Sequence, residues 1–163
     1  MEFDEFYREH YSRIQRAMAL GFRDSGLADD ITQEAFYRAL RRWRRVSKLE
    51  RPDAWTMVVA LNLGRDNFRR DRRHKSKASL LVGTESENVG QQDVEDRMLV
   101  VELLDSLTHR QREVLVLRYV GQLSVPEIAR SLNCAEGTVK STLHMALEKA
   151  SRRAKGAERV DDR

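Results

Sequence analysis

Residues 123–150, LSVPEIARSLNCAEGTVKSTLHMALEKA, contain the side-chain pattern with the clearest chemical content in this sequence. Two helical patterns are separated by a short break, and the second begins with small and polar groups on the face opposite its apolar stripe. That face carries Gly137, Thr138, Ser141, His144, Met145 and Glu148, flanked by Lys140 and Thr142. Small residues let a helix enter a DNA groove, where polar side chains can contact base edges or phosphates.

The alternative for this stretch is an ordinary helical hairpin whose second helix simply faces water. Four further cations follow on the same helix, namely Lys149, Arg152, Arg153 and Lys155. They can contact the phosphate backbone, and they therefore favour DNA binding over the hairpin alone.

A second feature is the basic block from Arg38 to Arg73, which holds twelve Lys or Arg and four Asp or Glu. A solvated helix surface would explain such a block, as it explains most charge runs. Aromatic residues are interleaved with the cations, namely Tyr37, Trp43, Trp55 and Phe68. Bases stack on rings while cations hold phosphates, so the block favours a nucleic acid, although core packing explains most of these rings equally well.

Catalytic and metal-binding chemistry has little support. The four histidines, His10, His74, His109 and His144, lack metal-ligand spacing, and we expect each to be a plain surface residue. No glycine-rich phosphate loop is present, and Cys134 has no basic neighbour to activate its thiol. We therefore expect no enzyme, no metal and no cofactor.

The two helices of the opening stretch have recognisable boundaries. Ser124 precedes Val-Pro-Glu, so Ser124 and Glu127 can form a capping box, and Pro126 is tolerated in the first turn. Asn133 accepts the left-handed conformation at the end of this helix. The next helix should bury one stripe, consisting of Val139, Leu143, Ala146 and Leu147. Two helices joined by so short a turn form a helix-turn-helix.

The rest of the chain reads as further helices. Apolar residues recur at helical spacing from Phe3 to about Gly21, and a second helix is predicted from Leu27 to Val46, with Asp29 and Asp30 in its first turn. A third helix begins near Pro52 and continues to about Arg73. Periodicity fails from about 74 to 93 and resumes with VEDRMLVVELLDSL; Thr108 then caps the following helix. We therefore predict an all-α fold with two small helical domains, 1–73 and 94–155, a flexible linker at 74–93 and a flexible tail at 156–163.

Composition places the protein among soluble helical proteins, with 34% charged and 40% apolar residues and a net charge of +4. No run approaches the roughly 20 apolar residues that span a bilayer, and the N-terminus lacks a signal sequence. A single cysteine excludes an internal disulfide. We expect a cytoplasmic protein that does not bind a membrane.

The chain resembles an extracytoplasmic-function (ECF) sigma factor of bacterial RNA polymerase over nearly its whole length. LTHRQREVLVLRYVGQLSVPEIARSLNCAEGTVKSTLHMALEKA is similar to sigma-70 region 4. DDITQEAFYRALRRW is similar to region 2.2, and RPDAWTMVVALNLGRDNFRRDRR to regions 2.3 and 2.4. Both halves in this order and at this length make the resemblance specific.

The resemblance implies three binding sites. Core polymerase would be bound, through the beta-prime clamp helices, by Asp29, Asp30, Gln33, Glu34, Arg38, Arg41 and Arg42. Single-stranded promoter DNA at the minus-10 element would meet Lys48, Arg51, Asp53, Trp55, Asn62, Arg65 and Arg69. Duplex DNA at minus-35 would meet Thr138, Lys140, Ser141, Thr142, His144, Met145 and Lys149. A core position is favoured for Trp55 itself, and Met57 and Val58 stand where many relatives have an aromatic residue and an arginine.

The resemblance also implies further partners and a mechanism. Region 4 would bind the beta flap, and an anti-sigma factor would hold the protein inactive. Two weak DNA readers on one tether gain affinity when both are fixed on a polymerase. The competing interpretation is a free-standing helix-turn-helix repressor or activator, which would bind a symmetric operator without polymerase.

Overall fold

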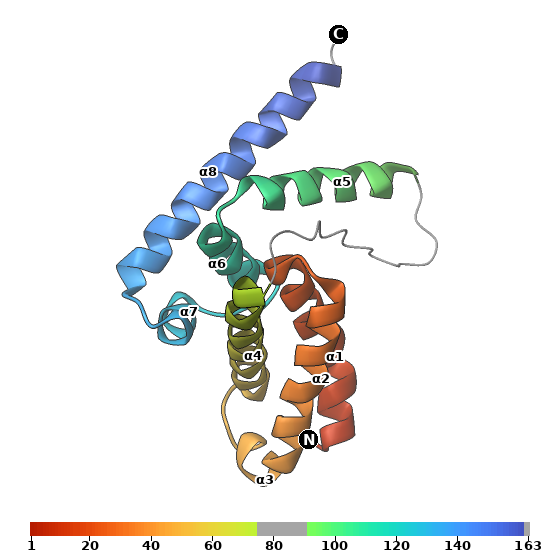
Figure 1. Ribbon diagram of the computed structural model, residues 1–163, viewed down its shortest axis with the longest axis vertical. Coiled ribbons are helices and arrows are strands. Elements are labelled where there is room, and N and C mark those ends of the chain that lie inside the picture. Colours follow the sequence, from red (N-terminus) through yellow and green to blue (C-terminus); the bar gives the residue numbers. More distant parts are fainter. Residues whose placement is uncertain (75–90, 162–163) are drawn as a thin grey trace.

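The structure is a computed structural model that describes residues 1–74 and 91–161, with side chains described for 1–71 and 97–156. Every regular element in those residues is a helix, which confirms the predicted all-α class. In chain order these are α1 (Phe3–Phe22), α2 (Ser25–Arg41), α3 (Trp43–Val46), α4 (Pro52–His74), α5 (Gln91–Ser106), α6 (His109–Tyr119), α7 (Val125–Leu132) and α8 (Glu136–Asp161) (Figure 1). We refer to α1–α4 as the N-terminal half and to α5–α8 as the C-terminal half.

The N-terminal half is built from α1, α2 and α4, which pack around a shared apolar core. Its largest fully buried side chains are Phe6, Ile14, Met18, Phe36 and Met57. The chain turns sharply between α1 and α2, and the carboxylate of Asp24 caps α2 by accepting a hydrogen bond from the Leu27 amide at 3.0 Å.

The position of the α2 cap corrects one detail of the sequence analysis. Because α2 begins at Ser25, two residues before the predicted Leu27, Asp29 and Asp30 lie in its second turn. No acidic residue lies in the first turn, so the cap of Asp24 takes over the dipole compensation expected there.

Close packing of α4 on α1 depends on a small residue at position 64. A Cβ atom placed on Gly64 would lie 2.3 Å from Cε2 of Phe22 and 3.0 Å from Cδ1 of Ile31. Phe22 is buried, so its ring has little room to move aside. Glycine at this position therefore sets how closely α4 approaches α1 and α2.

The helix predicted from Leu27 to Val46 is broken in the structure. Arg42 has a non-helical backbone (φ −116°, ψ 17°), and it separates α2 from the short α3. The break directs Trp43 toward α1, where its ring lies 4.9 Å from Phe6 and 5.3 Å from Phe3, centroid to centroid. These aromatic contacts favour the break. Helical periodicity could not predict it, because the contacts are with residues 37 or more positions away.

The C-terminal half contains the predicted helix-turn-helix, formed by α7 and α8. The capping box of Ser124 with Glu127 is present at the start of α7, and Thr108 forms a second box with Gln111 at the start of α6. Asn133 ends α7 in the left-handed conformation (φ 51°, ψ 51°), as predicted. These local signals fix the short turn that directs the chain from α7 into α8.

The two ends of the C-terminal half differ from the prediction. The helix α8 continues to Asp161, whereas residues 156–163 were predicted to form a flexible tail. Gly156 alone does not stop a helix that continues through Ala157 and Glu158, which are good helix formers. Of the predicted linker 74–93, His74 belongs to α4 and 91–93 belong to α5, while 75–90 lie outside the described residues.

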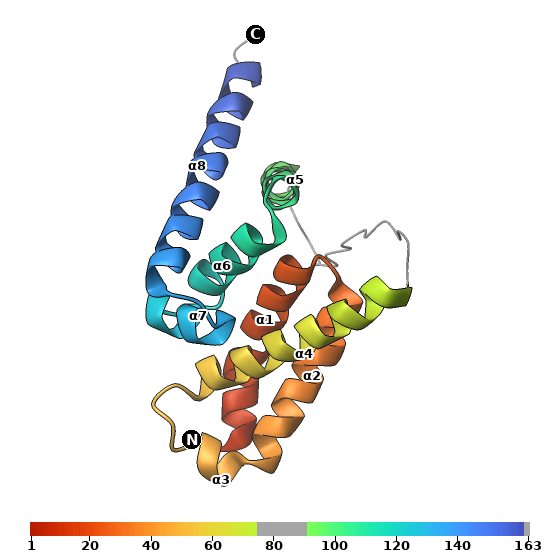
Figure 2. The same cartoon turned by 60° about the vertical axis from the view of Figure 1, so that its left-hand side comes forward.

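The two halves pack against each other, with α6 beside α1 (Figure 2). Their buried apolar residues form one continuous cluster. Arginines of each half donate to main-chain carbonyls of the other: Arg13 Nη1 to Gly121 at 2.7 Å, and Arg112 Nε to Gly21 at 3.1 Å. We call this packing the closed arrangement. The predicted pair of tethered domains left the relative orientation open.

Candidate nucleic-acid interface

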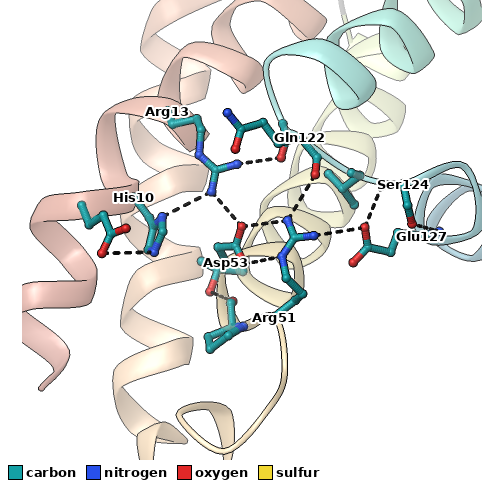
Figure 3. Close-up of polar contacts among 12 residues, drawn as sticks. His10, Arg13, Arg51, Asp53, Gln122, Ser124 and Glu127 are labelled. Carbon is teal, nitrogen blue, oxygen red and sulfur yellow. Dashed lines mark hydrogen bonds and ion pairs between the residues drawn. The ribbon is translucent and has the colours of Figure 1, made fainter. Parts of the chain in front are cut away.

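The residues predicted to meet single-stranded DNA lie on α4 and on the loop that precedes it, and two of them are bound to the C-terminal half. Arg51 forms a two-pronged pair with Asp53, with Nε to Oδ1 and Nη2 to Oδ2 both at 3.0 Å (Figure 3). Its Nη1 reaches Oε2 of Glu127 on α7 at 3.5 Å, and its Nη2 donates to the Gln122 carbonyl at 3.2 Å. Arg51 therefore bridges the two halves.

Asp53 holds this network together from the first turn of α4. It accepts from Arg13 Nη2 at 2.8 Å as well as from Arg51. Burial alone would raise the pKa of Asp53, but the hydrogen bonds from Arg51 and Arg13 outweigh it and hold the pKa far below its ordinary value. The same pair, chiefly through the hydrogen bond to Asp53, raises the pKa of Arg51. Asp53 thus orients a cation, and as a carboxylate it would repel a phosphate.

Arg65, which lies further along α4, makes the second bridge between the halves. Its Nε donates to Oε1 of Glu113 at 2.9 Å, and its Nη1 contacts the Ser131 carbonyl at 3.4 Å. Glu113 is only 4% exposed and also accepts from Arg110 Nη1 at 3.0 Å. Glu113 is thus a buried carboxylate with two guanidinium partners, one from each half of the molecule.

The remaining minus-10 candidates are not part of these bridges. Lys48, Asn62 and Arg69 are exposed, and Trp55 is half-buried. The candidates therefore divide into an exposed group and the interface group of Arg51, Asp53 and Arg65.

The minus-35 candidates occupy the outward face of α8. The exposed ones are Thr138, Lys140, Ser141, His144 and Met145. The hydroxyl of Ser141 donates to the Thr138 carbonyl at 3.1 Å, and His144 lies 3.7 Å from a carboxylate oxygen of Glu148. Both side chains remain accessible to an approaching duplex.

Two members of the minus-35 set lie elsewhere on the helix. Thr142 is 7% exposed and its hydroxyl donates to the Thr138 carbonyl at 2.8 Å, so it packs inward. Lys149 is half-buried, and its Nζ donates to Oε1 of Gln111 at 3.1 Å. The predicted buried stripe is right for Val139, Leu143 and Ala146 and wrong for Leu147, which is 42% exposed. The packing of α5, α6 and α7 against α8, which helical spacing alone does not fix, decides which residues at the edge of the stripe are buried.

The polymerase-binding candidates lie along α2 and its C-terminal end. Most are exposed, namely Asp29, Asp30, Gln33, Arg38, Arg41 and Arg42, while Glu34 is partly exposed. Glu34 accepts from Arg38 Nε at 2.7 Å, and Asp29 accepts from Gln15 of α1 at 2.9 Å. Exposed Tyr37 and Leu40 lie on the same helix, a mixture of charged and apolar groups typical of a protein-binding surface.

His109 differs from the predicted surface histidine. Its ring stacks on Phe68 of α4 with centroids 5.4 Å apart and planes 4° from parallel. Burial lowers the pKa of His109, with Glu113 opposing this and three nearby arginines adding to it. Its Nδ1 is buried without a hydrogen-bond partner in the part of the chain that the structure describes. The correction has a tertiary cause: α4 covers the first turn of α6.

Sequence reasoning missed the residues that join the halves, chiefly Arg13, Arg112, His109 and Glu113. Charged residues on amphipathic helices usually face water, so nothing in the local pattern marks Glu113 as buried. Glu127 was found only as a helix cap. Its second role, in contact with Arg51, uses the same oxygen, Oε2, that accepts from the Ser124 amide.

Other kinds of site receive no support from the described residues. Among them, no three His, Cys, Asp or Glu side chains are grouped so that they could bind a metal ion. None of the helices in those ranges has the length and apolar character needed to cross a bilayer.

Comparison with known proteins identifies both halves. Residues 6–74 match the family described as Sigma-70 region 2, and residues 97–149 match the family described as Sigma-70, region 4. Both matches occur in one chain, in the expected order, which does not favour a free-standing repressor or activator.

Relatives that align with most of this chain agree. The RNA polymerase sigma-E factor of Streptomyces coelicolor is 31% identical over 147 residues, which cover 90% of this chain and 82% of the relative. The ECF RNA polymerase sigma factor SigL of Mycobacterium tuberculosis is 30% identical over 149 residues, covering 86% of this chain and 82% of SigL.

Two solved structures share the fold. The sigma factor RpoE in complex with the anti-sigma factor NepR, from Bartonella quintana, matches with a TM-score of 0.69 at 18% identity, over 94% of this chain and 96% of RpoE. CnrH in complex with the cytosolic domain of CnrY matches with a TM-score of 0.60 at 24% identity, over 94% and 88%. With two sigma-70 regions in order and relatives that align along most of its length, the chain belongs to the ECF sigma factors, which direct RNA polymerase to promoters and start transcription.

Proposed function

We propose that this sigma factor acts through three separate surfaces, one for polymerase and two for promoter DNA. The α2 surface binds the beta-prime clamp helices, the α4 surface captures the minus-10 strand, and the outward face of α8 reads the minus-35 duplex. The observation that carries this assignment is the row of exposed polar residues at the start of α8, on a helix whose entry is fixed by the capped α7.

The minus-35 surface consists of Thr138, Lys140, Ser141, His144 and Met145. Lys140 supplies charge for phosphates, while Ser141 and His144 offer hydrogen-bonding groups to base edges. Thr142 supports the surface from below by packing inward. Lys149 is held by Gln111, so it reaches the backbone only after that hydrogen bond is released.

The minus-10 surface combines cations with an amide and a ring. Arg51, Arg65 and Arg69 hold phosphates, Asn62 offers both a donor and an acceptor to a base, and Lys48 extends the charged track. Asp53 positions Arg51 and does not contact the strand.

Two protein partners are proposed besides the clamp helices. The C-terminal half binds the beta flap of the polymerase, so that both halves are held at a fixed spacing on one surface. An anti-sigma factor covers the polymerase-binding surfaces when transcription is not required, as the known complexes of RpoE and CnrH suggest by analogy. The protein performs this binding role in the cytoplasm and carries out no catalytic step itself.

The test is run-off transcription from genomic fragments, using core polymerase with and without this protein. We expect new start sites only in its presence. Lys140→Ala should weaken promoter binding on all sequences and reduce the slope of log affinity against log salt by about 1. Arg8→Ala, which removes an exposed cation of α1, is the matched control. If no new start sites arise, the assignment of the surfaces fails.

A further inference from the structure

Two arginines of the α4 surface, Arg51 and Arg65, are engaged by the C-terminal half in the closed arrangement, while most of the α2 and α8 surfaces is exposed. Arg51 and Arg65 each contact one carboxylate and one main-chain carbonyl of the C-terminal half. Every one of these partners lies between Glu113 and Ser131, on α6, on α7 or in the loop between them. One continuous stretch of the C-terminal half therefore occupies both arginines.

The groups that occupy the arginines are chemically close to those of a DNA backbone. A guanidinium donates paired hydrogen bonds equally well to carboxylate and to phosphate oxygens. Glu113 and Glu127 bear their charge at the positions where, on the proposed function, phosphates of the minus-10 strand would lie. Arg51 and Arg65 therefore cannot bind the DNA strand and the C-terminal half at the same time.

We propose that the C-terminal half is an internal competitor of the minus-10 strand, with Glu113 and Glu127 holding Arg65 and Arg51 until the halves separate. This inference rests on the proposed function and concerns the regulation of the same surface. The closed chain keeps α2 available to polymerase and withholds only Arg51 and Arg65 of the α4 surface. Docking of the two halves at separate places on polymerase then releases the arginines where a promoter is present.

The contact is suited to opening because ion pairs and hydrogen bonds form part of it, beside the shared apolar cluster. The side chain of Arg51 is 39% exposed, so water and salt weaken its attraction to Glu127. A third ion pair joins Arg23 Nε to Asp105 Oδ1 at 2.9 Å, outside the proposed DNA surface. Interfaces of this mixed character within a chain permit relative motion of the parts they join.

The variants Glu113→Gln, Glu127→Gln and Asp105→Asn remove one charge each from the contact. Glutamine can replace glutamate in a capping box, so Glu127→Gln keeps the start of α7 intact. Asp105→Asn weakens the contact without touching any residue assigned to DNA. The matched control is Glu102→Gln, because Glu102 pairs with Arg153 at 3.8 Å within the C-terminal half and both side chains are exposed. Circular dichroism verifies that each variant is folded.

Two measurements on the full chain without polymerase test the inference. Small-angle X-ray scattering gives the radius of gyration, and fluorescence anisotropy gives the affinity for a single-stranded oligonucleotide containing the minus-10 sequence of a promoter found by run-off transcription. We expect the three variants to have a larger radius than the wild type. The two Glu variants and Asp105→Asn should bind the strand more tightly, by up to roughly fivefold for Glu113→Gln, which corresponds to raising the open fraction from about 10% to about 50%.

The control variant separates opening from a simple change in net charge. Glu102→Gln should leave both the radius and the affinity at the wild-type values. Equal radii and equal affinities for wild type and all three variants would overturn the inference. A gain in affinity that Glu102→Gln shares would also overturn it, since the cause would be net charge.

Failure of the inference and failure of the proposed function give different results. If the wild type supports run-off transcription but the variants neither expand nor bind more tightly, only the internal competition is wrong. If the wild type supports no transcription, the proposed function is wrong. The scattering data alone then decide whether charge removal opens the closed arrangement. If the variants do not expand, the inference is rejected as well.

Discussion

The two surfaces proposed to bind DNA differ in how accessible their side chains are. On α8 the side chains of Lys140, Ser141 and His144 are exposed, and the helix is supported only from its inner side. On α4 the side chains of Arg51 and Arg65 are engaged by the other half of the molecule. The surface proposed to bind the duplex is thus accessible in the isolated chain, whereas two arginines of the surface proposed to bind the single strand are already engaged. Charge explains the difference, because among the described residues only the α4 surface has carboxylates of the other half facing it.

The largest effect should come from making the same substitution in the helices that carry the two surfaces. Gly64→Ala should lower the free energy of unfolding by about 1–2 kcal/mol, because the overlap with Phe22 outweighs the higher helix propensity of alanine. Gly137→Ala meets nothing within 4 Å and should raise stability by about 0.5–1 kcal/mol. Urea unfolding monitored by circular dichroism measures both. Equal effects at both positions would mean that α4 is not tightly packed on α1.

The next effect concerns the two carboxylates that cover α4. Glu113→Gln should open the closed arrangement more than Glu127→Gln, by about threefold in open fraction, because Glu113 is far better shielded from water than Glu127. Scattering of the two variants gives the ranking.

Arg110→Gln is the comparison for that ranking. Arg110 and Glu113 both belong to α6, so their ion pair at 3.0 Å does not join the halves. When this ion pair is lost, Glu113 still pairs with Arg65, so the radius of gyration should stay at the wild-type value. An opening as large as that of Glu113→Gln would show that Glu113 acts by supporting its own half.

How far the sequence predicts this structure depends on how far apart the interacting residues are. Helix caps were predictable, since Ser124 and Glu127 are three residues apart and the motif needs no other part of the chain. The outward face of α8 was predictable for the same reason, as helical spacing decides most of it. Thr142 and Leu147 were assigned to the wrong sides because both lie at the edge of the apolar stripe, where packing by neighbouring helices decides.

The closed arrangement could not be predicted from local patterns. Arg13 and the Gly121 carbonyl are 108 positions apart, and Arg65 and Glu113 are 48 apart. Within each helix these residues look like ordinary solvated charges, and only the packing of α6 on α1 brings them together. The break at Arg42 has a similar origin in the contacts of Trp43.

Acidification should open the closed arrangement through His109. In the closed form burial, the largest cause, holds the pKa of His109 below its ordinary 6.5. Of the charged groups that face it, Arg112, Arg65 and Arg110 also lower the pKa, and Glu113 raises it. In the open form the ring regains water and a pKa near 6.5, so that form binds the proton more readily. The stability that neutral His109 gives to the closed form is therefore complete above pH 6.5 and declines below it.

Scattering between pH 8 and pH 5 measures this effect. We expect the radius of gyration to increase below about pH 6.5 in the wild type. His109→Gln cannot gain a charge in this range, so its radius should depend much less on pH. A wild-type radius that stays constant down to pH 5 contradicts the expected link between His109 and closure.

The smallest effect distinguishes neighbouring residues on α8. Ser141 faces outward and Thr142 inward, although both hydroxyls donate to the Thr138 carbonyl. Ser141→Ala should weaken binding to the minus-35 duplex by about 1 kcal/mol, as expected for one lost hydrogen bond, with unchanged stability. Thr142→Val keeps the shape of the buried side chain and should leave DNA binding unchanged while altering the free energy of unfolding by about 1 kcal/mol or less.

Gel-shift titration and urea unfolding on the same two variants separate these outcomes. The contrast is informative because the two hydroxyl residues are adjacent and face opposite sides of the helix. If Thr142→Val lost as much duplex affinity as Ser141→Ala, the helix would have to rotate about its axis when it enters the groove. The row of residues exposed on α8 in the free protein would then not be the face that contacts DNA.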